Sequence, residues 1–325
     1  MSGAHSAKPG RKGIRSQPAK PKLLAVIGPT AAGKTALAIG LAKRFNGEII
    51  SADSRQFYRG TAIGTDIIAG EWVRRDGRRV YLAHGVPHHL IAFRSPNRPV
   101  TLDGFRRLAR RRIKEIVSRG HLPILCGGTG LYVQAVTDNY RLPPAPPDPA
   151  LRAKLEIRST EDLFHELKRR DSAYAARISP NNRRYIIRAL EVMAATDRPF
   201  SAQQVKGEPE YDTLKLGVRR PREVLYRKID RRVDEMIEAG LVKETERLVK
   251  RSGWDTPAMT GLGHRQIGQY LRGQVSLPEA IRLIKRDTRH YARRQLIWWR
   301  RDRAIKWVRG LSEAERLLTR FLAGK

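Results

Sequence analysis

The sequence predicts an α/β protein with a parallel sheet, flanking helices and a helical insertion domain. Short apolar runs at residues 23–27, 48–52 and 122–126 alternate with helical patterns, an order typical of a doubly wound parallel sheet. The first run leads directly into a glycine-rich motif at residues 28–35. A proline-rich stretch at residues 142–149 then interrupts the α/β pattern, and polar helical patterns follow it.

Length and charge narrow the class of protein. The chain has 325 residues, enough for about two domains. Its 65 Lys and Arg against 32 Asp and Glu leave a net charge of +33, and a surplus of this size favours a polyanionic partner. Because 40% of the residues are hydrophobic and strand and helix patterns are regular, we expect a folded chain.

The cysteine count and hydropathy bear on location. Cys126 is the single cysteine, which excludes an internal disulfide and a cysteine-based zinc site. No apolar stretch reaches the roughly 18 to 20 residues that a membrane-spanning helix requires. We therefore expect a soluble, cytoplasmic monomer without membrane contact.

Composition divides the chain into four parts. Residues 1–21 hold five Lys or Arg, three prolines and no acid, which predicts a flexible basic arm; an organellar transit peptide is the alternative, disfavoured by the glycines and prolines. Residues 22–142 form the first part of the α/β core. Residues 143–213 begin with the prolines and read as a helical insertion that binds the polyanion. Residues 214–325 return to the core with a strand at 214–218 and continue as a basic helical region, with helices at 222–250 and 276–299.

The motif after the first strand is a phosphate-binding loop. Its sequence, GPTAAGKT, fits G-x-x-x-x-G-K-[ST] and lies between a strand and an amphipathic helix, which makes the predicted fold P-loop NTPase-like. Backbone N–H groups and the helix N-terminus would hold phosphate, Lys34 would add charge, and the Thr35 hydroxyl would hold Mg²⁺. The predicted diphosphate-binding residues are Gly28, Pro29, Thr30, Ala31, Ala32, Gly33, Lys34 and Thr35.

The ends of the other strands add two candidate residues. Nucleotide hydrolases usually carry a magnesium-holding Asp on a second strand, but here the strand at 122–126 leads into Gly127, Gly128 and Thr129. Diphosphate binding without γ-phosphate transfer therefore stays open. Ligands bind at the carboxyl ends of parallel strands, so Asp53 is expected near Lys34. Its carboxylate can accept a proton from an amine or hydroxyl; a turn or helix-cap role is the structural alternative.

Two further features have competing interpretations. Adjacent His88 and His89 point in different directions and have no further ligand cluster, so a structural role is favoured over metal binding. Residues 286–309 hold nine Arg or Lys and four Tyr or Trp. Such residues can neutralise RNA phosphates and stack on bases, although Trp299 and Trp307 could equally anchor the core.

A series of motifs carries a family resemblance. Between about residues 23 and 309 the chain contains, in order, GPTAAGKT, DSRQFY, PHHL, GGTGLY, RRYIIRALEV, GLVKE, GLGHRQ and YARRQLIWW. In these motifs it resembles the tRNA dimethylallyltransferases, also called tRNA isopentenyltransferases. Members of that family transfer the dimethylallyl group of dimethylallyl diphosphate to the N6 amine of adenosine 37, beside the anticodon of tRNA.

The resemblance implies roles for individual residues. Thr30 and Lys34 would contact the diphosphate as catalytic residues, Asp53 would be the general base toward N6, and tRNA and dimethylallyl diphosphate would be the partners. The implied tRNA-binding residues are Asp53, Ser54, Arg55, Gln56, Thr129, Arg152, Arg184, Tyr185, Arg188, Gly263, His264 and Arg265.

Some positions depart from the family pattern. Ala92 replaces an acid after PHHLI, residues 66–68 replace Ala-Lys-Pro, and His264 replaces a Tyr. Thr260 and Gly261 stand where some members carry Arg. Two other functions stay open on the residues alone: an isopentenyltransferase acting on free adenine nucleotides, and a P-loop ATPase or RNA-binding protein without prenyl transfer.

Overall fold

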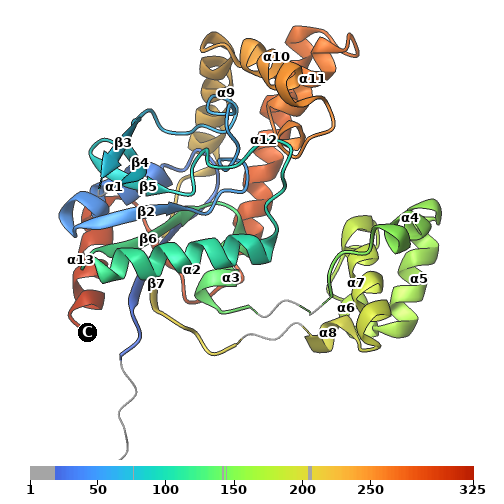
Figure 1. Ribbon diagram of the computed structural model, residues 1–325, viewed down its shortest axis with the longest axis horizontal. Helices are drawn as coiled ribbons and strands as arrows, with labels where there is room; N and C mark the ends of the chain where they lie inside the picture. The colour runs from blue at the N-terminus through green and yellow to red at the C-terminus, as the bar shows by residue number, and fades with distance from the viewer. Residues whose placement is uncertain (1–18, 76, 141–142, 144, 204–206) are drawn as a thin grey trace, which may run out of the picture.

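The computed structural model describes residues 19–75, 77–140, 143, 145–203 and 207–325. In this part of the chain eight strands form one sheet in the order β3-β4-β5-β2-β6-β1-β7-β8 (Figure 1). Residues 1–18, most of the expected basic arm, lie outside the described residues. No helix in the described ranges is both long enough and apolar enough to span a membrane.

The centre of the sheet is parallel, as the sequence predicts. Strands β5, β2, β6, β1, β7 and β8 run parallel to one another in this order. Their bounds are β1 Lys22–Ile27, β2 Gly47–Ser51, β5 Val86–His89, β6 Leu122–Gly127, β7 Asp212–Val218 and β8 Lys306–Val308. β7 begins two residues before the predicted strand, because Lys22 also pairs with Asp212. The carboxyl ends of β1, β2 and β6 therefore lie side by side.

One edge of the sheet differs from the prediction. Strands β3 (Glu71–Arg75) and β4 (Arg78–Ala83) form an antiparallel hairpin, and β4 pairs antiparallel with β5. A wholly parallel sheet is therefore wrong for this edge. Apolar side chains face each other at two positions of the hairpin, Val73 opposite Val80 and Trp72 opposite Tyr81. Because the residues around them are mostly arginines, the sequence shows no clear strand pattern here.

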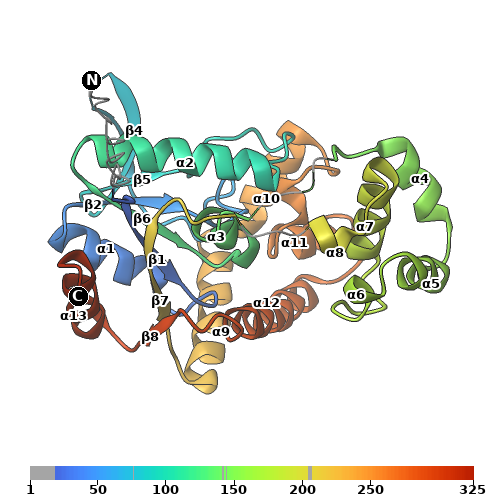
Figure 2. The same ribbon diagram turned by 90° about the horizontal axis from the view of Figure 1, so that it is seen from below.

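Helices cover both faces of the sheet (Figure 2). Helices α1 (Lys34–Arg44) and α13 (Leu311–Leu322) pack on one face, where they share a core with Leu24 and Val26 of β1. Helices α2 (Leu102–Ser118) and α3 (Gly130–Thr137) pack on the other, where the core includes Leu23 and Ala25. Alternate side chains of β1 thus enter opposite layers, as a strand buried on both faces requires.

The residues after the prolines form a separate helical lobe (Figure 1). It contains α4 (Pro149–Ile157), α5 (Thr160–Arg170), α6 (Ser172–Ala175), α7 (Arg183–Thr196) and α8 (Phe200–Gln203), which surround their own core. The sequence predicts one helical stretch over 151–169, but the chain breaks into two helices. Arg158 is extended, and the Ser159 hydroxyl accepts a hydrogen bond from Asp162 N at 3.0 Å, which starts α5.

The remaining helices follow β7 in the chain. These are α9 (Arg222–Glu238), α10 (Leu241–Ser252), the short 3₁₀ helix η1 (Ala258–Thr260), α11 (His264–Leu271) and α12 (Leu277–Trp299). The single helix expected over 222–250 is interrupted by Gly240, whose φ of 94° is in the left-handed region. Trp299, at the end of α12, is fully buried in the sheet core, which favours the structural role considered for it.

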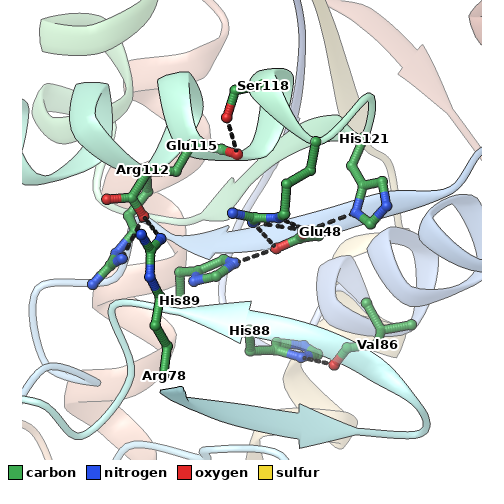
Figure 3. Close-up of polar contacts among 10 residues, drawn as sticks. Glu48, Arg78, Val86, His88, His89, Arg112, Glu115, Ser118 and His121 are labelled. Atoms are coloured by element: carbon green, nitrogen blue, oxygen red, sulfur yellow. Dashed lines mark hydrogen bonds and ion pairs between the residues drawn. The ribbon is translucent and has the colours of Figure 1, made fainter. Parts of the chain in front are cut away.

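A buried carboxylate fastens strand β2 to its surroundings (Figure 3). Both oxygens of Glu48 accept hydrogen bonds from Arg119, and one accepts from His121 Nδ1 at 2.6 Å. His89 of β5 contacts the other oxygen through Nε2, also at 2.6 Å. Burial raises the pKa of Glu48, but the hydrogen bonds from His89, Arg119 and His121 outweigh it and lower the pKa to about 2. His89 is thus a structural residue.

Candidate active site

The phosphate-binding loop joins β1 to α1. Its glycines Gly28 and Gly33 have φ of 142° and 95°, conformations that a side chain would strain. A Cβ on Gly28 would also lie 3.2 Å from the Val218 carbonyl oxygen. Lys34 folds back over the loop and donates a hydrogen bond from Nζ to the Pro29 carbonyl at 2.7 Å. Desolvation lowers the pKa of Lys34, and a half-buried cation of this kind favours an anionic ligand.

A cavity of about 290 Å³ opens beside this loop. Residues of β2, of β6 and of the loop after β1 line it, and α9 contributes charged side chains. Residues of the loop and of the strand ends that line it are Thr30, Ala31, Gly33, Lys34, Thr35, Ala36, Ile49, Ser51, Asp53, Gln56, Cys126 and Gly127. Residues of the other segments are Thr65, Asp66, Ile68, His88, Ile91, Lys228, Arg231, Arg232 and Glu235. Both the diphosphate loop and Asp53 thus face one space.

Asp53 ends the stretch that follows β2. Its Oδ1 accepts a hydrogen bond from Arg55 N at 2.9 Å, so the carboxylate does stabilise a turn. Among the described residues no hydrogen bond ends on Oδ2. Asp53 also interacts electrostatically with Lys34 across the cavity. The turn role and the chemical role of Asp53 are therefore compatible, because each oxygen has a separate environment.

Thr129 lies beside Asp53 and connects β6 to α12. Its hydroxyl oxygen accepts a hydrogen bond from Ser54 N at 3.2 Å, and Tyr291 of α12 lies near it. Burial raises the pKa of Tyr291 to about 12, which keeps the phenol protonated. The structure thus brings together Asp53, Ser54 and Thr129, as expected from their strand ends, and adds Tyr291.

Two residues that organise the phosphate loop come from distant helices. Gln295 of α12 accepts a hydrogen bond from Thr30 N at 2.8 Å and donates one to the Gly128 carbonyl at 2.9 Å. Arg232 of α9 donates from Nη1 to the Thr30 hydroxyl at 3.1 Å. Neither residue was predicted from the sequence as part of the site, although Gln295 lies within the YARRQLIWW motif. A helix pattern gives no sign of a contact made more than 200 residues away.

Arg55 and Gln56 mainly form hydrogen bonds with other residues of the protein. Arg55 donates from Nη1 to the Thr260 hydroxyl at 2.6 Å and to the Pro257 carbonyl at 3.0 Å. Gln56 accepts from the Ser51 hydroxyl at 2.9 Å and donates to carbonyls of the 65–66 segment. These contacts fasten the Asp53 turn to the loop before α11 and to the cavity wall.

The model of a family described as IPP transferase matches residues 56–302, and a second, described as isopentenyl transferase, matches residues 21–89. The chain belongs to the IPP transferase family. The match at 56–302 covers most of the chain, and the likeness inferred from the motifs is confirmed.

Individual relatives extend this finding. A tRNA dimethylallyltransferase of Thermomicrobium roseum is 48% identical over 290 residues, covering 88% of this chain and 85% of the relative. The full-length tRNA isopentenylpyrophosphate transferase of Bacillus halodurans superposes with a TM-score of 0.68 at 39% identity, over 94% of this chain and 96% of that one. A eukaryotic dimethylallyltransferase acting on tRNA gives a TM-score of 0.74 at 25% identity, covering 94% and 80%.

The residues expected to bind tRNA after η1 divide into buried and exposed ones. His264 is fully buried, and its Nε2 contacts Glu244 Oε1 at 3.0 Å. The same carboxylate accepts hydrogen bonds from Ile63 N and Gly64 N. The expectation of an RNA contact through His264 is therefore corrected: the side chain is inaccessible and positions the 63–64 loop. Arg265 is exposed and pairs with Asp287 at 2.9 Å, while Gly263 is buried at the start of α11.

The insertion residues divide in a similar way. The Glu191 side chain is fully buried and forms ion pairs with Arg152 at 2.9 Å and Arg188 at 2.6 Å. Both arginines therefore neutralise a carboxylate inside the lobe. Arg184 and Tyr185, at the start of α7, are exposed, Tyr185 by 43%. Of these four expected RNA contacts, the structure leaves Arg184 and Tyr185 most available to a ligand.

The cavity offers oxygen ligands that suit Mg²⁺. Thr35, Asp53 and Asp66 all line it, and hydroxyl and carboxylate oxygens are the hard ligands that Mg²⁺ prefers, usually together with substrate phosphates. No group of three His, Cys, Asp or Glu in the described ranges is arranged to hold a metal by itself. The donor set therefore fits a magnesium ion that arrives with a diphosphate.

Proposed function

We infer that this protein transfers the dimethylallyl group of dimethylallyl diphosphate to N6 of adenosine 37 in tRNA, giving N6-isopentenyladenosine and diphosphate. The observation that carries this inference is the single cavity shared by the phosphate loop and Asp53. Relatives that cover most of the chain are named tRNA dimethylallyltransferase. An enzyme with this activity needs an anion site for the leaving group and a base for the amine, and the cavity contains both.

The residues of the cavity can act on each group that changes in the transfer, the amine and the leaving diphosphate. The N6 nitrogen attacks C1 of the prenyl group as the bond from C1 to the diphosphate oxygen breaks, and the displaced electron pair leaves with the diphosphate. Asp53 takes the proton that N6 loses. Lys34 and the loop N–H groups stabilise the charge that develops on the diphosphate, and Arg232, which contacts Thr30, is placed to do the same.

The apolar part of the cavity suits the prenyl group. Ile49, Ile68 and Ile91 line it beside the polar residues, and burial lowers the pKa of the adjacent His88. A neutral imidazole and aliphatic walls exclude water from the developing allylic cation. Hydrolysis of dimethylallyl diphosphate is thereby disfavoured relative to transfer to the amine.

We propose Thr35 as the protein ligand of Mg²⁺ in this site. When bound, the ion would neutralise charge on the leaving diphosphate. The hydroxyl of the residue after the loop Lys has this role wherever a P-loop holds a metal with phosphates. Support for the assignment is the position of Thr35 on the cavity wall.

The tRNA would lie across the basic side of the site. The exposed side chains of α12 include Arg293 and Arg294, and Arg300 directly follows the helix. Those of the helical lobe include Arg184 and Tyr185. Arginines neutralise phosphates, while an exposed tyrosine can stack on an unpaired base. A net charge of +33 disfavours self-association, which supports a monomer; the single cysteine suits the reducing cytoplasm.

Incubation with labelled dimethylallyl diphosphate tests this function. Separate reactions contain unmodified tRNA, AMP and ATP, and the labelled products are separated by size. We expect label in tRNA, at the adenosine next to the anticodon. Label in AMP or ATP alone would support the free-nucleotide isopentenyltransferase. Release of inorganic phosphate from ATP with no prenyl transfer would support the ATPase and would contradict the proposal.

A further inference from the structure

Asp66 introduces a negative charge into the diphosphate cavity. It lies on the loop between β2 and β3 and lines the cavity together with Thr35 and Lys34. Its φ of 52° places a non-glycine residue in the left-handed region, a conformation that must be held by its surroundings. Gln56 does so by donating a hydrogen bond to the Asp66 carbonyl at 3.2 Å, and Asp66 N donates to the Ile63 carbonyl.

One guanidinium connects this carboxylate to the phosphate loop. Arg232 Nη2 lies 3.1 Å from Asp66 Oδ2, while Nη1 of the same side chain donates to the Thr30 hydroxyl at 3.1 Å. Burial raises the pKa of Asp66, and Arg232 and Lys34 oppose that rise. Two of the cations that contact the phosphate loop therefore also interact electrostatically with Asp66.

This arrangement reduces the positive charge that remains for a ligand. A diphosphate without metal carries several negative charges. In this cavity those charges meet cations that Asp66 already neutralises, and they also lie near the Asp66 carboxylate. A divalent cation on the diphosphate cancels two of those charges, and carboxylate and hydroxyl oxygens are ligands that Mg²⁺ accepts. The same side chain thus opposes the bare anion and favours its metal complex.

We propose that Asp66 makes this site selective for metal-complexed diphosphate over free diphosphate. The proposal deepens the proposed function, on which it rests, because the diphosphate is the leaving group of that reaction. The resemblance described above leads one to expect Ala at position 66, where this chain has Asp.

Binding of inorganic diphosphate to the full-length protein tests the proposal. Isothermal titration calorimetry compares affinity with Mg²⁺ and with EDTA at constant ionic strength, for the wild type and for Asp66→Asn. For the wild type we expect Mg²⁺ to raise the affinity roughly tenfold or more, as a single nearby charge in a partly buried site can do. In Asp66→Asn we expect the metal-free affinity to rise roughly fivefold and the effect of Mg²⁺ to fall to about twofold or less.

Glu235 provides a matched control. It lines the same cavity and its side chain is as exposed as that of Asp66, 60% against 59%, but it pairs with Arg231 at 3.2 Å and not with Arg232. Glu235→Gln should therefore keep the wild-type ratio between the two affinities. Circular dichroism establishes that each variant is folded, and Asp66→Ala serves as the second variant if the Asn substitution impairs folding.

Two results would overturn the proposal. An unchanged magnesium effect in Asp66→Asn would show that the carboxylate does not select the metal complex. Equal loss of affinity with and without Mg²⁺ would show that Asp66 only positions Arg232. Failure of prenyl transfer to tRNA with a magnesium-selective diphosphate site would instead contradict the proposed function alone.

Discussion

Asp53 uses its two carboxylate oxygens for different purposes. Oδ1 accepts the Arg55 amide and shapes the turn, whereas Oδ2 receives no hydrogen bond from the described residues and is available to a substrate proton. A substitution that keeps the hydrogen bond from Arg55 N but cannot accept a proton can therefore separate the structural role of Asp53 from its chemical role. Asparagine does this, because its amide oxygen can still accept from Arg55 N.

Asp53→Asn should abolish most turnover while leaving the fold intact. We expect the rate of prenyl transfer to fall by roughly 10² or more, the scale of a lost general base, with tRNA affinity largely retained. Single-turnover kinetics with saturating tRNA measure the rate, and a thermal melt checks folding. A folded variant with a rate within a few-fold of wild type would remove Asp53 from the base role.

Lys34→Ala should act on the diphosphate and hardly on the RNA. The substitution removes a half-buried cation that caps the phosphate loop, so diphosphate affinity and prenyl transfer should both collapse. Competition binding with inorganic diphosphate and filter binding of tRNA measure the two affinities. Lys43→Ala, on the exposed side of the same helix, is the control and should change neither. Weakened tRNA binding with normal diphosphate binding would reverse the placement of the two substrates.

At the scale of single elements, the sequence predicts those features that depend on residues close together in the chain. The phosphate loop could be predicted because an apolar strand, the glycines, Lys34 and Thr35 are all within one short segment. The β3–β4 hairpin could not, because its strands are short and rich in arginine. The contacts of Arg232 and Gln295 with Thr30 depend on how distant helices pack, which no single-sequence period encodes. The burial of His264 escaped prediction for the same reason.

The attachment of strand β2 to β5 and α2 should depend on pH. The lowered pKa of Glu48 means that its ionised form stabilises the fold, fully above about pH 4.5 and progressively less as the pH falls toward 2. Glu48→Gln should therefore lower the free energy of unfolding by about 3 kcal/mol at pH 7, and by less in acid. Urea unfolding at several pH values measures the difference.

Glu115→Gln supplies the comparison for Glu48. Glu115 also pairs with arginines, Arg112 at 2.5 Å and Arg78 at 3.6 Å, but its side chain is about five times as exposed, 25% against 5%. Its replacement should cost less than about 1 kcal/mol. A Glu48 variant as stable as the wild type at pH 7 would show that the cluster in Figure 3 adds no net stability.

At the scale of the whole molecule, the charge surplus is divided between interior and surface. Arg152 and Arg188 neutralise Glu191 within the lobe, and Arg232 pairs with Asp66 in the cavity. Arg184 and Arg293 are exposed and have no ion pair with a described acid, so they remain for an external polyanion. Net charge from the sequence indicates the partner class, but only the structure shows which cations are already paired.

Binding of tRNA should therefore depend steeply on salt. The logarithm of affinity should fall linearly with the logarithm of salt concentration, by about 0.7 to 0.9 for each phosphate neutralised. The double substitution Arg184→Ala with Arg293→Ala should weaken binding and reduce the slope by one to two units. Filter binding between low and moderate salt measures both quantities, with diphosphate affinity as a control.

Arg188→Ala is the informative contrast to that double variant. Loss of a partner of buried Glu191 should lower the stability of the helical lobe by roughly 3 kcal/mol, with little change in the salt slope. A slope near zero for the wild type would mean that the surface charge is not used on RNA. A large slope change in Arg188→Ala would restore this residue to the RNA-contacting set.

Helix α12 connects the phosphate loop with the basic surface that is proposed to bind tRNA. Its buried Gln295 bonds the Thr30 amide of the phosphate loop, and Arg293 and Arg294 of the same turns face solvent. If binding one substrate shifts this helix, the other site shifts with it, and the two binding equilibria are then thermodynamically linked. Linkage is reciprocal: if tRNA tightens diphosphate binding by some factor, diphosphate must tighten tRNA binding by that same factor.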